Sequence, residues 1–250
     1  MIPSILPTPT ETDVARRVAA ELLDFAKETI ATRGRVVIGL PGGQTPLKLY
    51  EVLASEFASA APWSEVVITF GDERCVPRDH PESNQKRLHD VLLDRVDIPE
   101  VNVMEPIGPE VTAEVRDAAI HKKIAADYSA ALEQVVGEFG SLDLVLLGLG
   151  TDGHTASLFP PALESPSPEP LVVPTLAPKT SPVRARISLS YGALRAAREV
   201  WVLVTGGGKA EILSRVLAGE ESLPLSKVIR DRVGNVRFFV DAAAAQPPRR

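Results

Sequence analysis

A short segment, residues 142–160, carries the residue types of a hydrolytic site within a few positions. An apolar run, residues 142–147, ends in glycines, and the chain then presents Asp152, His154 and Thr155. Histidine has the side chain whose ordinary pKa lies closest to neutral, so it can remove a proton from water or from a sugar. In open α/β sheets, ligands bind beyond the carboxyl ends of the strands, where such side chains collect. Taken alone, the segment is equally typical of a tight turn with a solvent-facing histidine.

Two glycine-rich turns, residues 42–45 and 206–209, follow expected strands and open expected helices. Glycine lets backbone N–H groups approach an anion closely, and a helix N-terminus adds a favourable dipole. Neither turn has the G-x-x-x-x-G-K-[ST] spacing of a nucleotide loop, and neither is a G-x-G-x-x-G turn with an acidic partner. Because one turn carries Lys209, the pair favours phosphate binding without a nucleotide over two unrelated tight turns.

Charged residues also follow a third expected strand, residues 66–70. Arg74 can grip a phosphate or carboxylate with two parallel hydrogen bonds, while Asp72 can orient a partner or bind sugar hydroxyls. In isolation, Asp72, Glu73 and Arg74 are more typical of a surface ion pair. Asn84, further along, either donates hydrogen bonds to a substrate or simply begins a helix.

The remaining histidines and the single cysteine indicate no metal site. His80, His89 and His121 lack the spacing of metal ligands, so we expect no metal. Cys75 excludes an internal disulfide framework and suits a reducing compartment. A catalytic thiol is disfavoured because no base lies beside Cys75 in the sequence.

Composition excludes several classes of partner. Of 250 residues, 44% are hydrophobic and 24% charged, the balance of an ordinary globular protein with ample core. A net charge of −6 argues against a nucleic-acid partner, so an anionic ligand needs a local cluster of cations and N–H groups. The sequence has no apolar run of about 18 residues, the length that spans a membrane. Its first residues lack the basic segment followed by an apolar segment that is typical of a signal peptide. We therefore expect a cytoplasmic protein without a membrane partner.

The elements that must position these residues alternate between helix and strand. Helical spacing from Val14 to Phe25 predicts a helix capped by Thr10 or Thr12 and ended by Gly34. Apolar runs predict strands at residues 35–40, 66–70, 142–147, 186–190, 200–204 and 236–240. Helices are expected between them, among them one from Ser83 through Val96 and one from about Val111 to Val136. Residues 160–182, rich in proline, are expected to form an irregular loop.

This alternation is the signature of βαβ units. We expect a Rossmann-like α/β fold, with a mainly parallel sheet, helices on both faces, and one domain over residues 1–250.

These segments, in this order, resemble the 6-phosphogluconolactonases of the pentose phosphate pathway. The matching pieces span almost the whole chain and lie at residues 41–46, 63, 70–77, 83–84, 147–160, 186–188, 208–210 and 239–243. The Asp-Glu-Arg block and the Gly-His-Thr-Ala-Ser-Leu-Phe-Pro block are together highly specific. One departure is Gln44, which stands where relatives commonly have serine, so a hydroxyl contact to phosphate is lost there while backbone contacts are not.

The resemblance implies a fold shared with glucosamine-6-phosphate deaminase, and hydrolysis of 6-phosphoglucono-δ-lactone without a cofactor. It implies that His154 is the general base, that Asp152 or Asp72 fixes its imidazole, and that Arg74 faces the substrate. The phosphate-binding residues it implies are Gly42, Gly43, Gln44, Thr45, Arg186 and Lys209. Asn84 is expected to contact sugar hydroxyls or to support the Asp-Glu-Arg turn. The expected partner is a small sugar-phosphate lactone, bound by a monomer or weak homodimer.

Two other functions use the same fold. A sugar-phosphate deaminase or isomerase has a similar glycine–histidine turn, but deaminases typically carry Asp-Glu-Tyr, so Arg74 and residues 155–157 favour the lactonase. A sugar-phosphate sensor carries an added DNA-binding helix pair and a basic face, whereas this chain is acidic overall.

Overall fold

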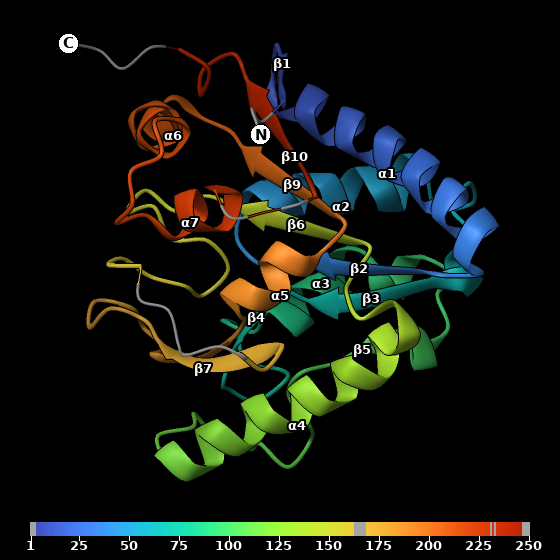
Figure 1. Cartoon of the computed structure of the whole chain (residues 1–250). Helices are drawn as coiled ribbons and strands as arrows, with labels where there is room; N and C mark the ends of the chain where they lie inside the picture. The colour runs from blue at the N-terminus through green and yellow to red at the C-terminus, as the bar shows by residue number, and fades with distance from the viewer. Residues whose placement is uncertain (1–3, 163–168, 231, 233, 247–250) are drawn as a thin grey trace.

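The computed structural model describes residues 4–162, 169–230, 232 and 234–246, and Figure 1 shows their arrangement. Within these residues a seven-stranded sheet forms the centre, and all its strand pairs are parallel. From edge to edge the strands are β1 (Ser4–Thr8), β10 (Asn235–Asp241), β9 (Glu199–Val204), β6 (Leu144–Gly148), β2 (Val36–Leu40), β3 (Val66–Phe70) and β5 (Val103–Met104). The predicted Rossmann-like α/β fold with a mainly parallel sheet is confirmed.

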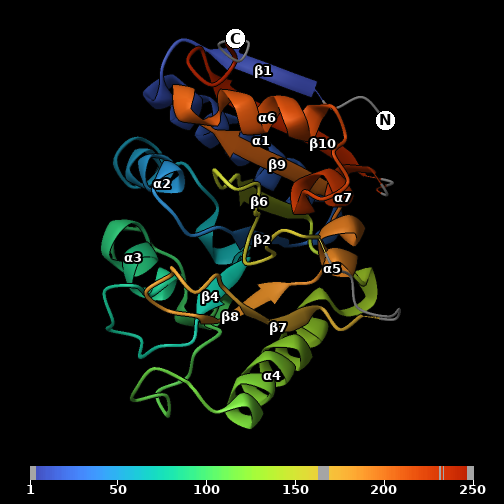
Figure 2. The same ribbon diagram turned by 90° about the vertical axis from the view of Figure 1, so that its left-hand side faces the viewer.

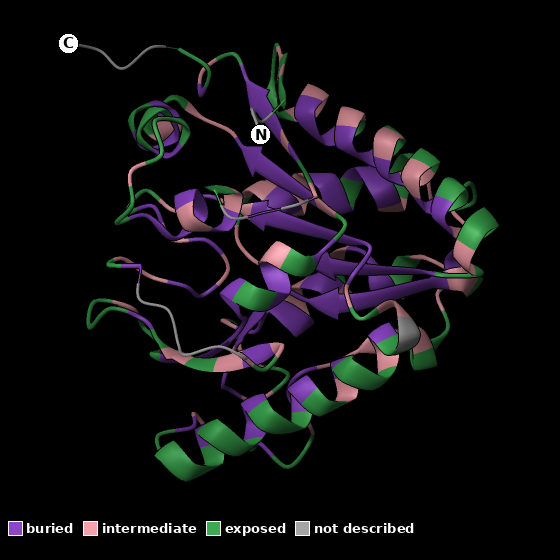
Figure 3. Ribbon diagram, viewed as in Figure 1, coloured by how far each residue is buried: buried purple, intermediate pink, exposed green. Residues whose placement is uncertain are grey.

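Helices cover both faces of this sheet because each strand sends alternate side chains to opposite sides. In β2, Val36, Ile38 and Leu40 join one core cluster, whereas Val37 joins the other. The first cluster includes α1 (Glu11–Arg33), α2 (Thr45–Glu56) and α3 (Asn84–Val91). The second includes α4 (Ala118–Val136), α5 (Tyr191–Ala196), α6 (Ala210–Leu217) and α7 (Pro224–Arg230). Figure 3 shows the central strands buried, while the outer faces of α1 and α4 are exposed.

A small antiparallel sheet lies beside the main one and is made of β4 (Asp72–Arg74), β8 (Ala185–Leu189) and β7 (Val172–Leu176), in that order. The chain passes from β3 to β4 at Gly71, whose N–H donates to the Leu40 carbonyl and whose carbonyl accepts from Leu189. Helix α4 packs against β7 and β8, as Figure 2 shows.

Helix ends follow their capping residues. The Thr10 hydroxyl accepts the Asp13 N–H, and Gly34 ends α1 in the left-handed conformation, as predicted. Ser83 caps α3 as expected, but α3 ends at Val91 rather than Val96. Helix α4 begins at Ala118, not near Val111, because the Asp117 carboxylate caps it there. No helix in the described part of the chain has the length and apolar character needed to cross a membrane.

Some strands that lie at sheet edges or pair over long distances are not predicted from the sequence. The segment 160–182 contains β7, so it is not wholly an irregular loop, although residues 163–168 lie outside the described residues. β1 and β7 are edge strands that carry Pro7 and Pro174, and an edge tolerates proline because one side of its backbone needs no partner.

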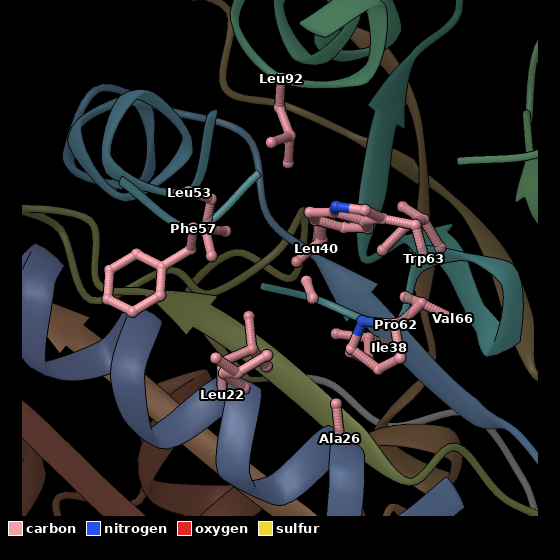
Figure 4. A pocket seen from close by; sticks show the side chains of 13 residues that line it. Leu22, Ala26, Ile38, Leu40, Leu53, Phe57, Pro62, Trp63, Val66 and Leu92 are labelled. Atoms are coloured by element: carbon pink, nitrogen blue, oxygen red, sulfur yellow. The ribbon is translucent and has the colours of Figure 1, made fainter. Parts of the chain in front are cut away.

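A small apolar cavity of about 30 Å³ remains between α1, α2 and the sheet (Figure 4). Its lining is Leu22, Leu23, Ala26, Ile38, Leu40, Leu53, Phe57, Ala61, Pro62, Trp63, Val66, Ile68 and Leu92. The cavity is a packing defect of about one methyl group, since no polar side chain faces it to hold a water.

Candidate active site

A second cavity, of about 440 Å³, opens at the carboxyl edge of the main sheet, the edge that faces the viewer in Figure 2. In the sheet, β3 and β5 lie on one side of β2, whereas β6, β9 and β10 lie on the other side. The loops after β2 and β6 therefore diverge at a topological switch point, where α/β sheets bind ligands. The lining is Pro41, Gly42, Gly43, Gln44, Thr45, Pro46, Asp72, Arg74, Gly148, Leu149, Gly150, Thr151, His154, Ala156, Arg186 and Lys209.

The first wall is the loop between β2 and α2. Gly43 has φ of 99°, a conformation that favours glycine. A Cβ at Gly42 would lie 2.1 Å from Asn84 Oδ1, so a larger residue there would have to displace the buried Asn84 side chain. Gln44 occupies the N-cap position of α2 without a side-chain capping bond. Pro46 has no N–H and the Leu47 N–H donates to the Gln44 carbonyl, so the backbone N–H groups placed for a ligand are those of Thr45 and the loop before it. The helix dipole favours an anion at this end.

The opposite wall is the loop after β6, which carries His154. The Asp152 carboxylate lies 2.6 Å from His154 Nδ1 and also accepts the His154 backbone N–H at 3.1 Å. The hydrogen bond from His154 lowers the pKa of Asp152 to about 2. An ionised carboxylate only accepts, so Nδ1 of the neutral ring carries the hydrogen and Nε2 is the basic nitrogen. Asp152, and not Asp72, is therefore hydrogen-bonded to the imidazole.

The third wall is the pair of strands β4 and β8. In their register, Asp72 faces Ser188 and Arg74 faces Arg186. Because side chains alternate along a strand, these four share one side of the ladder, whereas Glu73 lies on the other. Arg186 is 7% exposed, and its pKa is lowered by burial and then by Arg74. Two guanidinium groups held this close favour an anion between them.

Lys209 completes the lining from the turn after β9. Its ammonium donates to the Leu149 carbonyl at 2.7 Å, which holds it beside the histidine loop. Burial lowers the pKa of Lys209, while the nearby Asp152 opposes that shift. The hydroxyls of Thr45 and Thr205 lie 3.2 Å apart, so the two glycine-rich turns meet at one side of the cavity.

Glu73 and Asn84 lie behind the lining. Glu73 is fully buried, and its carboxylate accepts backbone N–H groups from Arg74, Asn84 and Gln85 at 2.6–2.8 Å, together with the Ser83 hydroxyl. Asn84 is 4% exposed and donates through Nδ2 to the Asp72 carbonyl at 3.0 Å. Asn84 thus supports the Asp-Glu-Arg turn and packs against Gly42, and it is not part of the cavity lining.

The structure gathers most of the residues singled out from the sequence into one cavity. Nine of them line it: Gly42, Gly43, Gln44, Thr45, Asp72, Arg74, His154, Arg186 and Lys209. Asp152 is not part of the lining but is hydrogen-bonded to His154, which is. Thr151 and Ala156 also line the cavity. Neither they nor Ser157 were predicted as site residues, although all three belong to the histidine motif that could have indicated them. Among the described residues, no three His, Cys, Asp or Glu side chains gather as a metal site requires.

A parallel sheet with a cavity at its switch point defines a Rossmann-like α/β protein, and the three cationic side chains in that cavity suit a small anionic ligand. Residues 9–238 match the family described as glucosamine-6-phosphate isomerases/6-phosphogluconolactonase, and the chain belongs to this family. The resemblance seen in the sequence motifs is thereby confirmed.

The chain aligns with most of the length of its relatives. A 6-phosphogluconolactonase from Nostoc sp. is 34% identical over 238 residues, 94% of each chain. One from Synechocystis sp. is 38% identical over 193 residues, 77% of this chain and 76% of the relative. The solved structure of 6-phosphogluconolactonase from Trypanosoma brucei superposes with a TM-score of 0.83 at 30% identity, over 97% of each chain.

Proposed function

We propose that this chain hydrolyses 6-phosphoglucono-δ-lactone to 6-phosphogluconate, with His154 as the general base. The observation that carries the proposal is one cavity that holds an imidazole with an ionised carboxylate partner and three cationic side chains. The names of the relatives support the same reaction.

The phosphate group is assigned to the cationic part of the cavity. Arg186 and Lys209 offer charge-assisted hydrogen bonds to a dianion, and the loop of residues 42–45 at the N-terminus of α2 offers backbone N–H groups. Thr45 adds a hydroxyl, and Gln44 acts through its backbone. Arg74 adjoins Arg186 and serves the phosphate or the charge that develops on the carbonyl oxygen.

The lactone carbonyl is assigned to a place beside His154. Water attacks the carbonyl carbon and gives its proton to Nε2, so a tetrahedral oxyanion forms. When that oxyanion collapses, the ring C–O bond breaks and the departing oxygen takes the proton from the imidazolium. Asp152 stabilises the imidazolium between these steps because its carboxylate stays ionised. Water is the nucleophile, so the proposed steps need no cofactor.

Asp72 and Asn84 support this arrangement from β4 and α3. Asp72 lines the same cavity and is assigned to the sugar hydroxyls, and Asn84 holds its backbone. Two further predictions accompany the proposal: the protein is cytoplasmic, and it acts as a monomer or weak homodimer.

The direct test is an assay of lactone hydrolysis by the purified chain, with spontaneous lactone opening measured in parallel and subtracted. Glucosamine-6-phosphate serves as the second substrate, with ammonia release as its readout. We expect hydrolysis of the lactone well above the spontaneous rate and no ammonia. Ammonia release without lactone hydrolysis would assign the cavity to a deaminase instead.

A further inference from the structure

Ser157 links the histidine loop to the strands of the small sheet. It is fully buried, and its hydroxyl donates to Asp72 Oδ2 at 2.6 Å. Its backbone N–H donates to Ser188 Oγ at 3.2 Å. Asp72 and Ser188 are direct partners across β4 and β8. One residue of the loop after β6 therefore binds both members of a cross-strand pair.

Asp72 is the one carboxylate on the side of the β4–β8 ladder that also carries two arginines. Arg74 is two positions along the same strand, and Arg186 is the diagonal neighbour on β8. Cross-strand and diagonal neighbours are close enough for long side chains to meet. A carboxylate here is therefore placed to pair with either guanidinium, and such a pair would compete with an anionic ligand.

The described contacts show no such pair. Arg74 lies 3.6 Å from Glu82 and Arg186 donates to the Val183 carbonyl, whereas the Asp72 carboxylate accepts from Ser157. Charge-assisted hydrogen bonds of this length are among the stronger ones in proteins. Burial also keeps water from replacing the Ser157 hydroxyl.

We infer that Ser157 is a positioning residue that holds the Asp72 carboxylate away from the arginine pair, so that Asp72 does not compete with the ligand anion for either guanidinium group. The inference rests on the proposed function, because it assigns the anionic end of the substrate to these cations. It adds a role for Ser157 and explains why an acidic side chain is tolerated inside a site for anions.

The histidine loop has anchors that do not involve Ser157. The Thr155 hydroxyl donates to the Gly148 carbonyl at 2.9 Å, and the Gly150 N–H donates to the His154 carbonyl at 2.8 Å. The backbones of Thr155 and Leu158 also exchange hydrogen bonds. Loss of the Ser157 hydroxyl should therefore release Asp72 without unfolding the loop.

The test is a double-mutant cycle on the affinity of the folded protein for 6-phosphogluconate, measured by titration calorimetry. Ser157→Ala should weaken binding about tenfold, the effect of one lost hydrogen bond to a charged group. In the Asp72→Asn background, where no charge can compete, the same change should have an effect of less than about twofold. Ser226→Ala is the matched control, because it removes a buried hydroxyl of α7 away from the cavity and should leave affinity unchanged.

An equal loss of affinity in both backgrounds would mean that Ser157 acts through the loop alone and would overturn the inference, as would no loss in either. If Ser157→Ala does not fold, Ser157→Cys takes its place in the cycle, since a thiol fills the site but donates weakly. If the native protein binds no 6-phosphogluconate, the proposed function itself is contradicted. This result differs from the one that tests Ser157, which compares the loss of affinity in the two backgrounds.

Discussion

At the scale of single residues, the contact between Asp152 and His154 determines which nitrogen can act as a base. The carboxylate binds Nδ1 and stays ionised, so Nε2 is the nitrogen that can accept a proton. The second aspartate of the cavity, Asp72, is held instead by Ser157. Two carboxylates in one site thus have different tasks because each has a different hydrogen-bond partner.

Replacing His154 should therefore affect the chemical step. His154→Ala should lower kcat by about 10²–10⁴-fold, the usual contribution of a positioned general base, and should change KM only a few-fold. Steady-state kinetics, with the spontaneous reaction subtracted, measure both constants. His89→Ala is the control, because His89 lies on α3 between Asp94 and Glu105 and outside the cavity lining. An undiminished kcat in His154→Ala would remove the assignment of the base.

At the scale of elements, Glu73 joins strand β4 to the N-terminus of α3. Burial raises its pKa to about 7 from an ordinary 4.5, and the backbone N–H groups that it accepts oppose the shift without cancelling it. A raised pKa in the folded state means that folding favours the protonated acid. The stability that Glu73 contributes is therefore fully present below pH 4.5 and is lost as the pH rises through 7.

Glu73→Gln should remove this pH dependence, because the amide has the same shape and does not titrate. The free energy of unfolding of the native protein, relative to that of the variant, should fall by about 3 kcal/mol between pH 4 and pH 8. Urea unfolding at a series of pH values measures the difference. A difference that rises over this range would place the pKa of folded Glu73 below that of the unfolded chain.

The packing of α1 and α2 on the sheet leaves the apolar cavity of Figure 4, and Val66 at the start of β3 lines it. Val66→Ile adds one methylene and keeps the β-branched shape that suits a strand. We expect a gain of about 0.5–1 kcal/mol in the free energy of unfolding, from one more buried methylene. Thermal unfolding should then shift upward by about 2 °C for a chain of this size.

Val67→Ile is the matched control for this change. Val67 is the next residue of β3, and its side chain joins the core cluster on the other face, away from the cavity. The same methylene should be neutral or destabilising there, because a filled core resists additional volume. Equal destabilisation by both substitutions would mean that the cavity cannot accept a methyl group.

At the scale of the whole molecule, the sequence predicts what local patterns encode. The buried strands and the caps at Thr10, Gly34 and Ser83 follow from apolar runs and hydrogen-bonding side chains, and the structure confirms them. Contacts between distant segments leave no local pattern. The pairing of Arg74 with Arg186 joins residues far apart in the chain, and β4 is too short to show strand periodicity.

The candidate site is likewise encoded only in part by local patterns. Residue types, glycine turns and the family resemblance together single out the candidate residues, and nine of those residues do line one cavity. The choice between Asp152 and Asp72 as the partner of His154 depends on side-chain geometry, as does the placement of Asn84 behind Gly42. Neither is encoded in spacing along the chain.

In the proposed function the cavity binds the two ends of the lactone by different groups, the phosphate by cations and the carbonyl beside His154. Most of the binding energy should then come from the phosphate. Glucono-δ-lactone, which lacks the phosphate, should show a kcat/KM about 10³-fold lower, since two or more charge-assisted hydrogen bonds are lost. Lys209→Ala should mainly raise KM for the phosphorylated lactone, by about 10–100-fold, and should barely affect the unphosphorylated one.

The comparison of the two lactones therefore separates the roles of the two ends. Lys209→Ala should shrink the preference for the phosphorylated substrate, whereas His154→Ala should slow both substrates alike and leave the preference intact. Lys86→Ala is the control, because this lysine pairs with Asp90 on the surface of α3. If Lys209→Ala slowed both lactones equally, the lysine would act at the carbonyl rather than on the phosphate, and the two ends of the ligand would have to be exchanged.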